Sequence, residues 1–205
     1  MKILTARPHR LLAACVDRLG EATARGEGCM FLVPPQYTLQ AELEIMERLH
    51  VSGSFLIDVL SPKRLQSRVF ELAGMPKQTL FDERGKCMVL SSIIEAQKDE
   101  LSVYRGAAQN GSSGFTARMS NMIASLKRSG LSAADVARSA ESMDTESPAR
   151  AKLGDIARIY AAYEQRMAGE LADAEDISRE MCARFEASGV FKGQNVFVYG
   201  FDMIT

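Results

Sequence analysis

Residues that usually carry metal or nucleophilic chemistry are scarce in this sequence. It has no tryptophan, only two histidines, and four cysteines in 205 residues. The cysteines, Cys15, Cys29, Cys87 and Cys182, lie far apart and form no CxxC pair, which argues against a zinc site and against a disulfide framework. We expect them to be reduced core residues. Neither histidine belongs to a Cys or carboxylate set with ligand spacing, so metal or nucleophilic catalysis has little support.

Long apolar runs and an excess of one charge are also missing. No run approaches the roughly 18 residues that indicate a membrane span, and the first residues lack a signal-peptide core. The sequence therefore predicts a cytoplasmic protein. Its net charge is −1, from 25 basic and 26 acidic residues, so any contact with DNA must depend on a local patch.

The first third of the chain alternates strand and helix patterns. Short apolar segments at 2–5, 29–33 and 54–60 predict strands, and helical periodicity follows each of them. After the last of these strands, Ser61 can cap a helix that has Pro62 in its first turn. Strands separated by helices predict a parallel sheet with right-handed crossovers.

The helix after the second strand has a clear apolar stripe. Leu39, Leu43, Met46 and Leu49 recur at helical spacing and form one face of a helix that runs to His50.

From residue 82 to about 188 only helical patterns occur, and the last long stripe runs from Leu153 to Leu171. The strand pattern resumes at Gln194. We therefore expect an incomplete, P-loop NTPase-like α/β domain formed by residues 1–81 and 189–205, with an inserted all-helical subdomain at 82–188.

Both halves of an ATP site are missing from the sequence. The segment 4–11, between the first strand and its helix, contains no glycine and no Gly-Lys-Ser/Thr sequence, so a phosphate loop is not expected there. The apolar strand around Val198 leads to Tyr199, where a P-loop NTPase has an acidic residue, and Asp202 comes three residues later. Because the chain stops soon after this strand, we expect it to be a fragment.

A strand that ends in two prolines is followed by polar residues suited to binding. Gln36 and Thr38 follow Pro35, and the carboxyl edge of a doubly wound sheet is where such folds bind ligands. Gln can pair with adenine or bridge to phosphate, and Thr can contact either phosphate or base. The alternative is a rigid connection in which Thr38 only caps the next helix.

Five segments, in this order and spacing, resemble the amino-terminal region of AddB, the second subunit of the bacterial AddAB helicase and nuclease that resects broken DNA ends for recombination. The segments read FLVPPQYT at 31–38, VLSPKRL at 59–65, SLKR at 125–128, AEDI at 174–177 and YGF at 199–201. Together they span nearly all of the chain.

The resemblance implies a helicase-like first domain of the superfamily 1 type with a helical insertion, at the head of a much longer subunit. The family uses ATP, magnesium and an iron–sulfur cluster, but this region would hold no cofactor and would not be catalytic. The implied partners are an AddA-type helicase/nuclease subunit and DNA, as double-strand ends and a single-stranded 3′ tail. The resemblance also implies a part in recognising the Chi recombination signal.

Four family positions that are implicated in Chi recognition match here, and none of them is catalytic. Gln36 and Thr38 keep the family's Gln and Thr, Arg64 keeps its Arg, and Phe201 keeps the aromatic after Gly200. Gln, Thr and Arg suit base edges or phosphate, and Phe suits stacking on a base.

Three positions depart from the family pattern. Pro62 stands where the family has an aromatic residue, Ser67 where it can have Trp, and Tyr199 where it has Asp. The first two leave the Chi sequence, and the response to Chi, open. The third agrees with the loss of the phosphate loop.

Two further interpretations remain open. Arg118, Lys127 and Arg128 could form a basic strip on the DNA backbone, or they could be solvated residues of an amphipathic helix. The chain could also be a scaffold that docks the partner helicase subunit without binding DNA.

Overall fold

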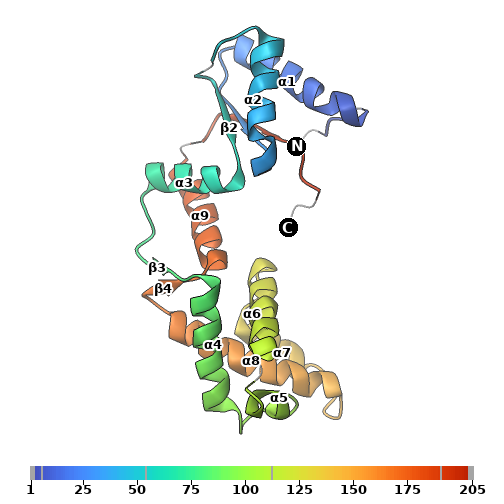
Figure 1. The fold of residues 1–205 in the computed structure, drawn as a ribbon, viewed down its shortest axis with the longest axis vertical. Coiled ribbons are helices and arrows are strands. Elements are labelled where there is room, and N and C mark those ends of the chain that lie inside the picture. Colours follow the sequence, from blue (N-terminus) through green and yellow to red (C-terminus); the bar gives the residue numbers. More distant parts are fainter. Residues whose placement is uncertain (1–2, 6, 54, 112, 190, 203–205) are drawn as a thin grey trace. The chain divides into compact units, whose positions relative to one another are not determined.

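A computed structural model describes residues 3–5, 7–53, 55–111, 113–189 and 191–202, and Figure 1 shows its ribbon. The chain forms two compact units. We call residues 1–75 with 181–205 the sheet unit, and residues 76–180 the helical unit. These boundaries fall at 75/76 and 180/181, whereas the sequence pattern puts them at 81/82 and 188/189.

The sheet unit is built on three parallel strands, which are β1 (Cys29–Leu32), β2 (Ile57–Leu60) and β5 (Asn195–Val198). Their order is β2-β1-β5, so β1 is central and the last strand of the chain lies beside it. Leu32 at the end of β1 is in register with Leu60 of β2 and with Val198 of β5. The three strands therefore end at one edge of the sheet.

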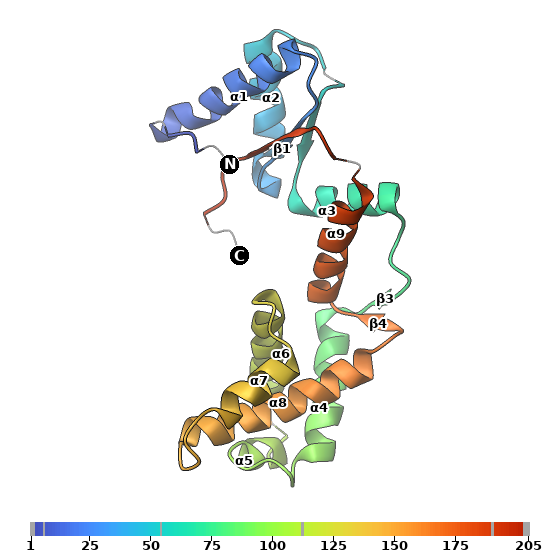
Figure 2. The same ribbon diagram turned by 180° about the vertical axis from the view of Figure 1, so that it is seen from behind.

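Helices cover both faces of this sheet (Figures 1 and 2). On one face, α1 (Pro8–Ala24) and α2 (Thr38–Leu49) pack over Phe31, which is fully buried. On the other face, α3 (Pro62–Ala73) and the last turns of α9 (Ala174–Ser188) pack over Met30. Alternate residues of β1 thus serve the two cores, as the two-residue period of a strand requires.

The predicted start of α3 is confirmed in detail. The Ser61 hydroxyl accepts a hydrogen bond from the Arg64 backbone N–H at 3.3 Å, and Pro62 occupies the first turn. This cap stops β2 and turns the chain into a helix directly at the sheet edge.

The expected first strand at 2–5 is wrong for residues 3–5, which have no strand pairing. Lys2, where that strand would begin, lies outside the described residues. The sheet of the described residues therefore has three strands and not four.

The apolar stripe of α2 faces away from the core. Leu39, Leu43 and Met46 are 66%, 56% and 41% exposed, while Ala41 and Ile45 are buried. Periodicity locates an apolar stripe on a helix but does not say which side the rest of the fold covers. Here the small Ala41 lets α2 lie close to its neighbours, and the large residues remain outside.

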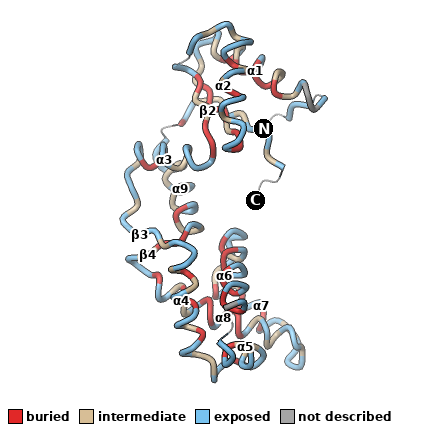
Figure 3. The backbone as a smooth tube through the Cα atoms, in the orientation of Figure 1, coloured by how far each residue is buried: buried red, intermediate tan, exposed pale blue. Residues whose placement is uncertain are grey.

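The helical unit contains α4 (Glu83–Gln97), α5 (Arg105–Gln109), α6 (Ser113–Arg128), α7 (Ala133–Glu141) and α8 (Pro148–Met167). The long helix α8 packs against α4 and α7, and α4 packs against α6 (Figure 2). Figure 3 shows the buried positions on the inward sides of these helices. Fully buried Leu90, Ile123 and Tyr163 anchor this core, as their predicted stripes require.

A small sheet in the helical unit was not predicted. Strands β3 (Thr79–Leu80) and β4 (Leu171–Ala172) pair in parallel. Leu171, which the sequence pattern assigns to the end of the long stripe, therefore belongs to β4, because α8 ends at Met167. Two-residue strands leave no periodic signal that a pattern could detect.

The cysteines are free, but they are not all core residues. Cys15 and Cys29 are buried, Cys87 is half-buried and Cys182 is exposed. Among the described residues no group of His, Cys, Asp and Glu side chains is placed to hold a metal ion. In the same ranges, no helix has both the length and the apolar character that crossing a membrane requires.

Candidate functional site at the sheet edge

Three loops meet at the carboxyl edge of the parallel sheet, and they carry the four residues that the sequence singles out. Gln36 lies in the 3-10 helix η1 (Pro35–Tyr37) after β1, and Thr38 begins α2. Arg64 lies in the first turn of α3 after β2, and Phe201 follows β5. Because the three strands end in register, residues distant in sequence share one edge of the sheet unit.

Backbone contacts join these loops to one another. The Val33 N–H donates to the Leu60 carbonyl oxygen at 2.9 Å, and the Tyr199 N–H donates to the Leu32 carbonyl oxygen at 3.0 Å. The ladder thus continues one residue past each strand end. It holds the edge in place before any side chain is considered.

Gly200 allows the last loop to approach the first. Its φ is +80°, and a Cβ at this position would lie 3.3 Å from Pro34 Cδ and 3.3 Å from Tyr37 Cδ2. A side chain would therefore meet both a strained backbone and a crowded neighbour. The glycine before Phe201 is a packing requirement of the site.

Tyr199 is packed among aromatic rings and does not replace the missing carboxylate. Its ring lies edge-on to Tyr37, with centroids 6.4 Å apart, and its centroid is 6.3 Å from that of Phe31. Burial raises the pKa of the Tyr199 hydroxyl above its ordinary value of 10.0. It therefore carries no negative charge near neutral pH, and it cannot attract a metal ion as an aspartate would.

The four candidate side chains differ in how available they are. Gln36 is exposed, and Thr38 and Phe201 are half-buried. The Thr38 hydroxyl donates to the Pro35 carbonyl oxygen at 3.0 Å, so it stabilises η1, but Thr38 does not cap α2, because Tyr37 occupies that position. Arg64 is 61% exposed and forms a loose ion pair with Glu42, with 3.7 Å between Nη1 and Oε1.

The proposed basic strip of the helical unit is not continuous. Lys127 is buried, and its ammonium lies 2.7 Å from Asp173 Oδ2 and 2.7 Å from Asp176 Oδ2. Arg128 is half-exposed and pairs with Glu175 at 3.0 Å, and Arg118 is exposed. Lys127 is thus an internal ion-pair residue, and its charge is already neutralised by carboxylates.

Sequence reasoning missed the buried network around Asp173. Its Oδ2 accepts hydrogen bonds from Lys127 and, at 3.0 Å, from the Tyr163 hydroxyl. Lys86, also buried, lies 3.7 Å from Asp173 and 3.2 Å from Glu175. Lys86, Lys127 and Asp173 are far apart in sequence, so no local pattern reveals the network. The acidic run at 173–176 beside two lysine-bearing helices was the only available signal.

The environment of Asp173 sets its ionisation. Burial alone would raise the pKa of this carboxyl group, but the hydrogen bond from Lys127, the Asp176 backbone N–H and the charges of both lysines outweigh burial. They lower the pKa from 3.8 to about 2. Asp173 is therefore ionised in the folded protein, as a buried carboxylate must be to balance two buried lysines.

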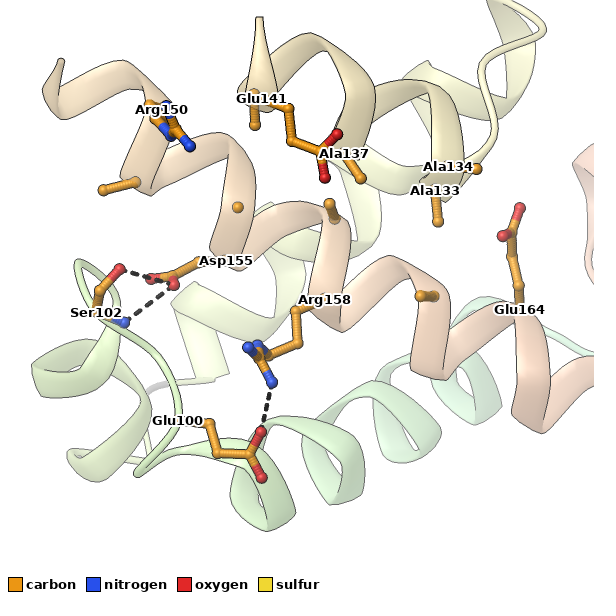
Figure 4. Close-up of a pocket in the computed structure, with 15 residues that line it drawn as sticks. Glu100, Ser102, Ala133, Ala134, Ala137, Glu141, Arg150, Asp155, Arg158 and Glu164 are labelled. Atoms are coloured by element: carbon orange, nitrogen blue, oxygen red, sulfur yellow. Dashed lines mark hydrogen bonds and ion pairs between the residues drawn. The ribbon is translucent and has the colours of Figure 1, made fainter. Parts of the chain in front are cut away.

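A groove of about 840 Å³ also lies in the helical unit, lined by α7, α8 and residues near 100 (Figure 4). Its wall is rich in alanine, and its charged groups are engaged. Asp155 accepts hydrogen bonds from the backbone N–H groups of Ser102, Val103 and Tyr104 at 2.8–3.0 Å, and Arg158 pairs with Glu100. Asp155 thus shapes the turn before α5 and offers nothing further to a ligand.

An α/β domain with a parallel sheet, and with polar and aromatic residues gathered at the carboxyl edge of that sheet, is the class that this structure defines. Comparison with known families is consistent with that class. The family model described as "ADDB, N-terminal" matches residues 7–205. The chain belongs to this family, the amino-terminal region of AddB.

Curated relatives are named as the second of two subunits, lettered B, of an ATP-dependent helicase/deoxyribonuclease. The protein of Bacillus anthracis is 31% identical over 183 residues, and that of Bacillus mycoides (strain KBAB4) is 30% identical over 183 residues. In both cases the match covers 86% of this chain and 16% of the relative. The protein of Alkaliphilus metalliredigens (strain QYMF) is 28% identical over 174 residues, covering 85% of this chain and 15% of that protein. The chain thus spans about one sixth of the length of these relatives.

Gly200→Ala should destabilise the sheet unit by roughly 1–2 kcal/mol, because the added Cβ meets Pro34 and Tyr37 in a left-handed backbone. Gly154→Ala is the matched control, since Gly154 lies in α8 with open space around it. That change should be neutral or slightly stabilising. Urea unfolding measures both changes, and equal effects at the two positions would contradict the packing role of Gly200.

Lys127→Met should destabilise the helical unit by about 3–5 kcal/mol at neutral pH, because it leaves Asp173 and Asp176 without their nearest cation. Arg128→Met, in the half-exposed pair with Glu175, should cost about 0–1 kcal/mol. The depressed pKa of Asp173 stabilises the native state fully above about pH 4, and this stabilisation is lost as pH falls towards about 2.

The difference in unfolding free energy between the native sequence and Lys127→Met should therefore shrink on acidification. Urea titrations between about pH 5 and pH 2 measure it. A difference that stays constant across this range would show that Asp173 ionisation is not coupled to Lys127.

Proposed function

We propose that this chain is the helicase-like amino-terminal region of an AddB-type subunit, and that it contacts single-stranded DNA without hydrolysing ATP. The observation that supports this most directly is the meeting of Gln36, Thr38, Arg64 and Phe201 at one sheet edge. The relatives are named as subunits of an ATP-dependent helicase/deoxyribonuclease, an activity that acts on DNA. On this proposal the region works in the bacterial cytoplasm, in the recombinational repair of double-strand breaks.

The chemistry of the edge suits a single strand. The exposed Gln36 amide offers both donors and an acceptor to a base edge or a phosphate, and the Arg64 guanidinium can bind a phosphate or a guanine. Phe201 supplies an aromatic ring on which an unpaired base can stack. An edge with stacking and hydrogen-bonding groups can distinguish bases only where the strand is unpaired, which fits the 3′ tail of a resected end and a Chi-type signal within it.

The ATP site does not support catalysis by this region. The segment before α1 has no phosphate-loop glycines, and Tyr199 occupies the place of the acidic residue. We propose that ATP and magnesium are used by an AddA-type partner, and that the iron–sulfur cluster and nuclease of the family belong to other parts of the assembly.

In the complete AddAB-type complex, Gln36→Ala and Phe201→Ala should weaken single-strand binding and blunt the response to the recombination signal. Loss of one stacked base should cost about 1–3 kcal/mol. ATP hydrolysis should remain at its normal rate, because neither residue belongs to an ATP site. Gln40→Ala is the control, since Gln40 is an exposed amide on α2. Fluorescence anisotropy with labelled oligonucleotides and an assay of Chi-dependent products measure the effect, and an unchanged Chi response would remove the site assignment.

A second function is supported by the outward apolar stripe of α2. Leu39, Leu43 and Met46 are large and exposed, and they are spaced at i, i+4 and i+7, which is how a helix presents itself to a partner helix. A scaffold that docks the partner helicase would use such a face.

The double substitution Leu39→Asp with Leu43→Asp separates the two functions. If the chain is a scaffold, the partner helicase should dissociate from the variant on size-exclusion chromatography while single-strand binding is retained. Because both positions face solvent, folding should be unaffected, which a thermal melt checks. A complex that stays intact would exclude docking at this face.

A further inference from the structure

The outward face of α3 is basic over its first two turns. Val69 and Phe70 point into the core under the sheet, and the opposite side of the helix presents Arg64 and Arg68, both exposed. Lys63 is exposed on the flank of the same face. Three cations thus lie within six successive residues on the solvent side of one helix.

This basic face starts at the sheet edge and leads away from it. Ser61 ends β2 and caps α3 through the Arg64 N–H, so the first turn of α3 belongs to the edge itself. Arg68 is four residues further along and therefore on the same face, about 6 Å from Arg64 along the helix axis. A chain of phosphates that reaches Arg64 can continue to Arg68 without leaving the helix.

The arginines of this face are held loosely. Arg64 Nη1 is 3.7 Å from Glu42 Oε1, and Arg68 Nη1 is 4.0 Å from Glu71 Oε2. By comparison, Arg48 and Asp17 in the same unit approach to 2.9 Å. Lys63 has no ion pair with any residue that the structure describes. Exposed pairs at such distances contribute little to stability, so a phosphate can replace the carboxylate at low cost.

We infer that Lys63 and Arg68 extend the DNA site along α3 and bind the phosphodiester backbone of the strand that passes the sheet edge. This inference rests on the proposed function. It divides the labour between the two parts of the surface. Gln36 and Phe201 contact bases at the edge, while Lys63, Arg64 and Arg68 neutralise phosphates beyond it and carry no sequence information.

The test uses the complete protein that carries this sequence, with a labelled oligothymidylate and a mixed-sequence oligonucleotide of equal length as probes. Lys63→Ala and Arg68→Ala should weaken binding of both probes by the same factor. Each should also reduce the slope of log K against log salt by about 0.7, the value for one lost phosphate contact on a single strand. Lys192→Ala, an exposed lysine elsewhere in the sheet unit, removes the same charge and should change neither.

A variant of opposite sign guards against effects of unfolding. Glu71→Gln removes the carboxylate that competes for Arg68, so it should strengthen binding of both probes and steepen the salt slope. A misfolded variant would not bind DNA more tightly.

The outcomes distinguish this inference from the proposed function. If Gln36→Ala and Phe201→Ala weaken binding while Lys63→Ala and Arg68→Ala do not, the α3 path is wrong and the edge site stands. If Lys192→Ala acts as strongly as the α3 variants, the effect is one of overall charge and the path is again wrong. If the unaltered protein binds neither probe, both proposals fail.

Discussion

The parallel pairing of β1 with β2 on one side and β5 on the other is the constraint on which the sheet unit depends. Residues near 30, 60 and 198 become neighbours only through this ladder. Since parallel strands all run the same way, the loops after them open at one edge, and the polar groups of three distant segments gather there. A slip of one residue at β5 would move Phe201 along the edge and would turn alternate side chains to the other face.

The helical unit depends on a different kind of interaction. Asp173 lies buried between Lys127 and Lys86, with the Tyr163 hydroxyl on the same oxygen. Buried ions repay their desolvation only when several partners are correctly placed, so this network specifies how α4, α6 and the start of α9 come together. The same observation changes the role of Lys127 from a surface cation for DNA to an internal one. Charges available to DNA lie on exposed surfaces such as α3 of the sheet unit.

Several features were predictable because they depend on neighbours in sequence. The Ser61 cap with Pro62 in the first turn, strand β1 before two prolines, and the buried stripe of α8 all follow from local rules. The features that were wrong depend on distant segments. The stripe of α2 has the right period but the opposite orientation, and Leu171 pairs with a strand some ninety positions earlier. The exposed Cys182 likewise shows that residue type alone does not decide burial.

The chemistry of the candidate site is already present in the chain, since Gln36, Arg64 and Phe201 and the lack of a phosphate loop can be read directly from its sequence. The family follows in the same way, from ordered motifs across the length of the chain. Folding alone establishes which of these residues share a surface, that Lys127 is neutralised internally, and that α2 turns its large apolar residues outward. The physical reason is that caps and periodicity act over a few residues, whereas strand register, burial and ion pairing depend on segments that meet only in the folded chain.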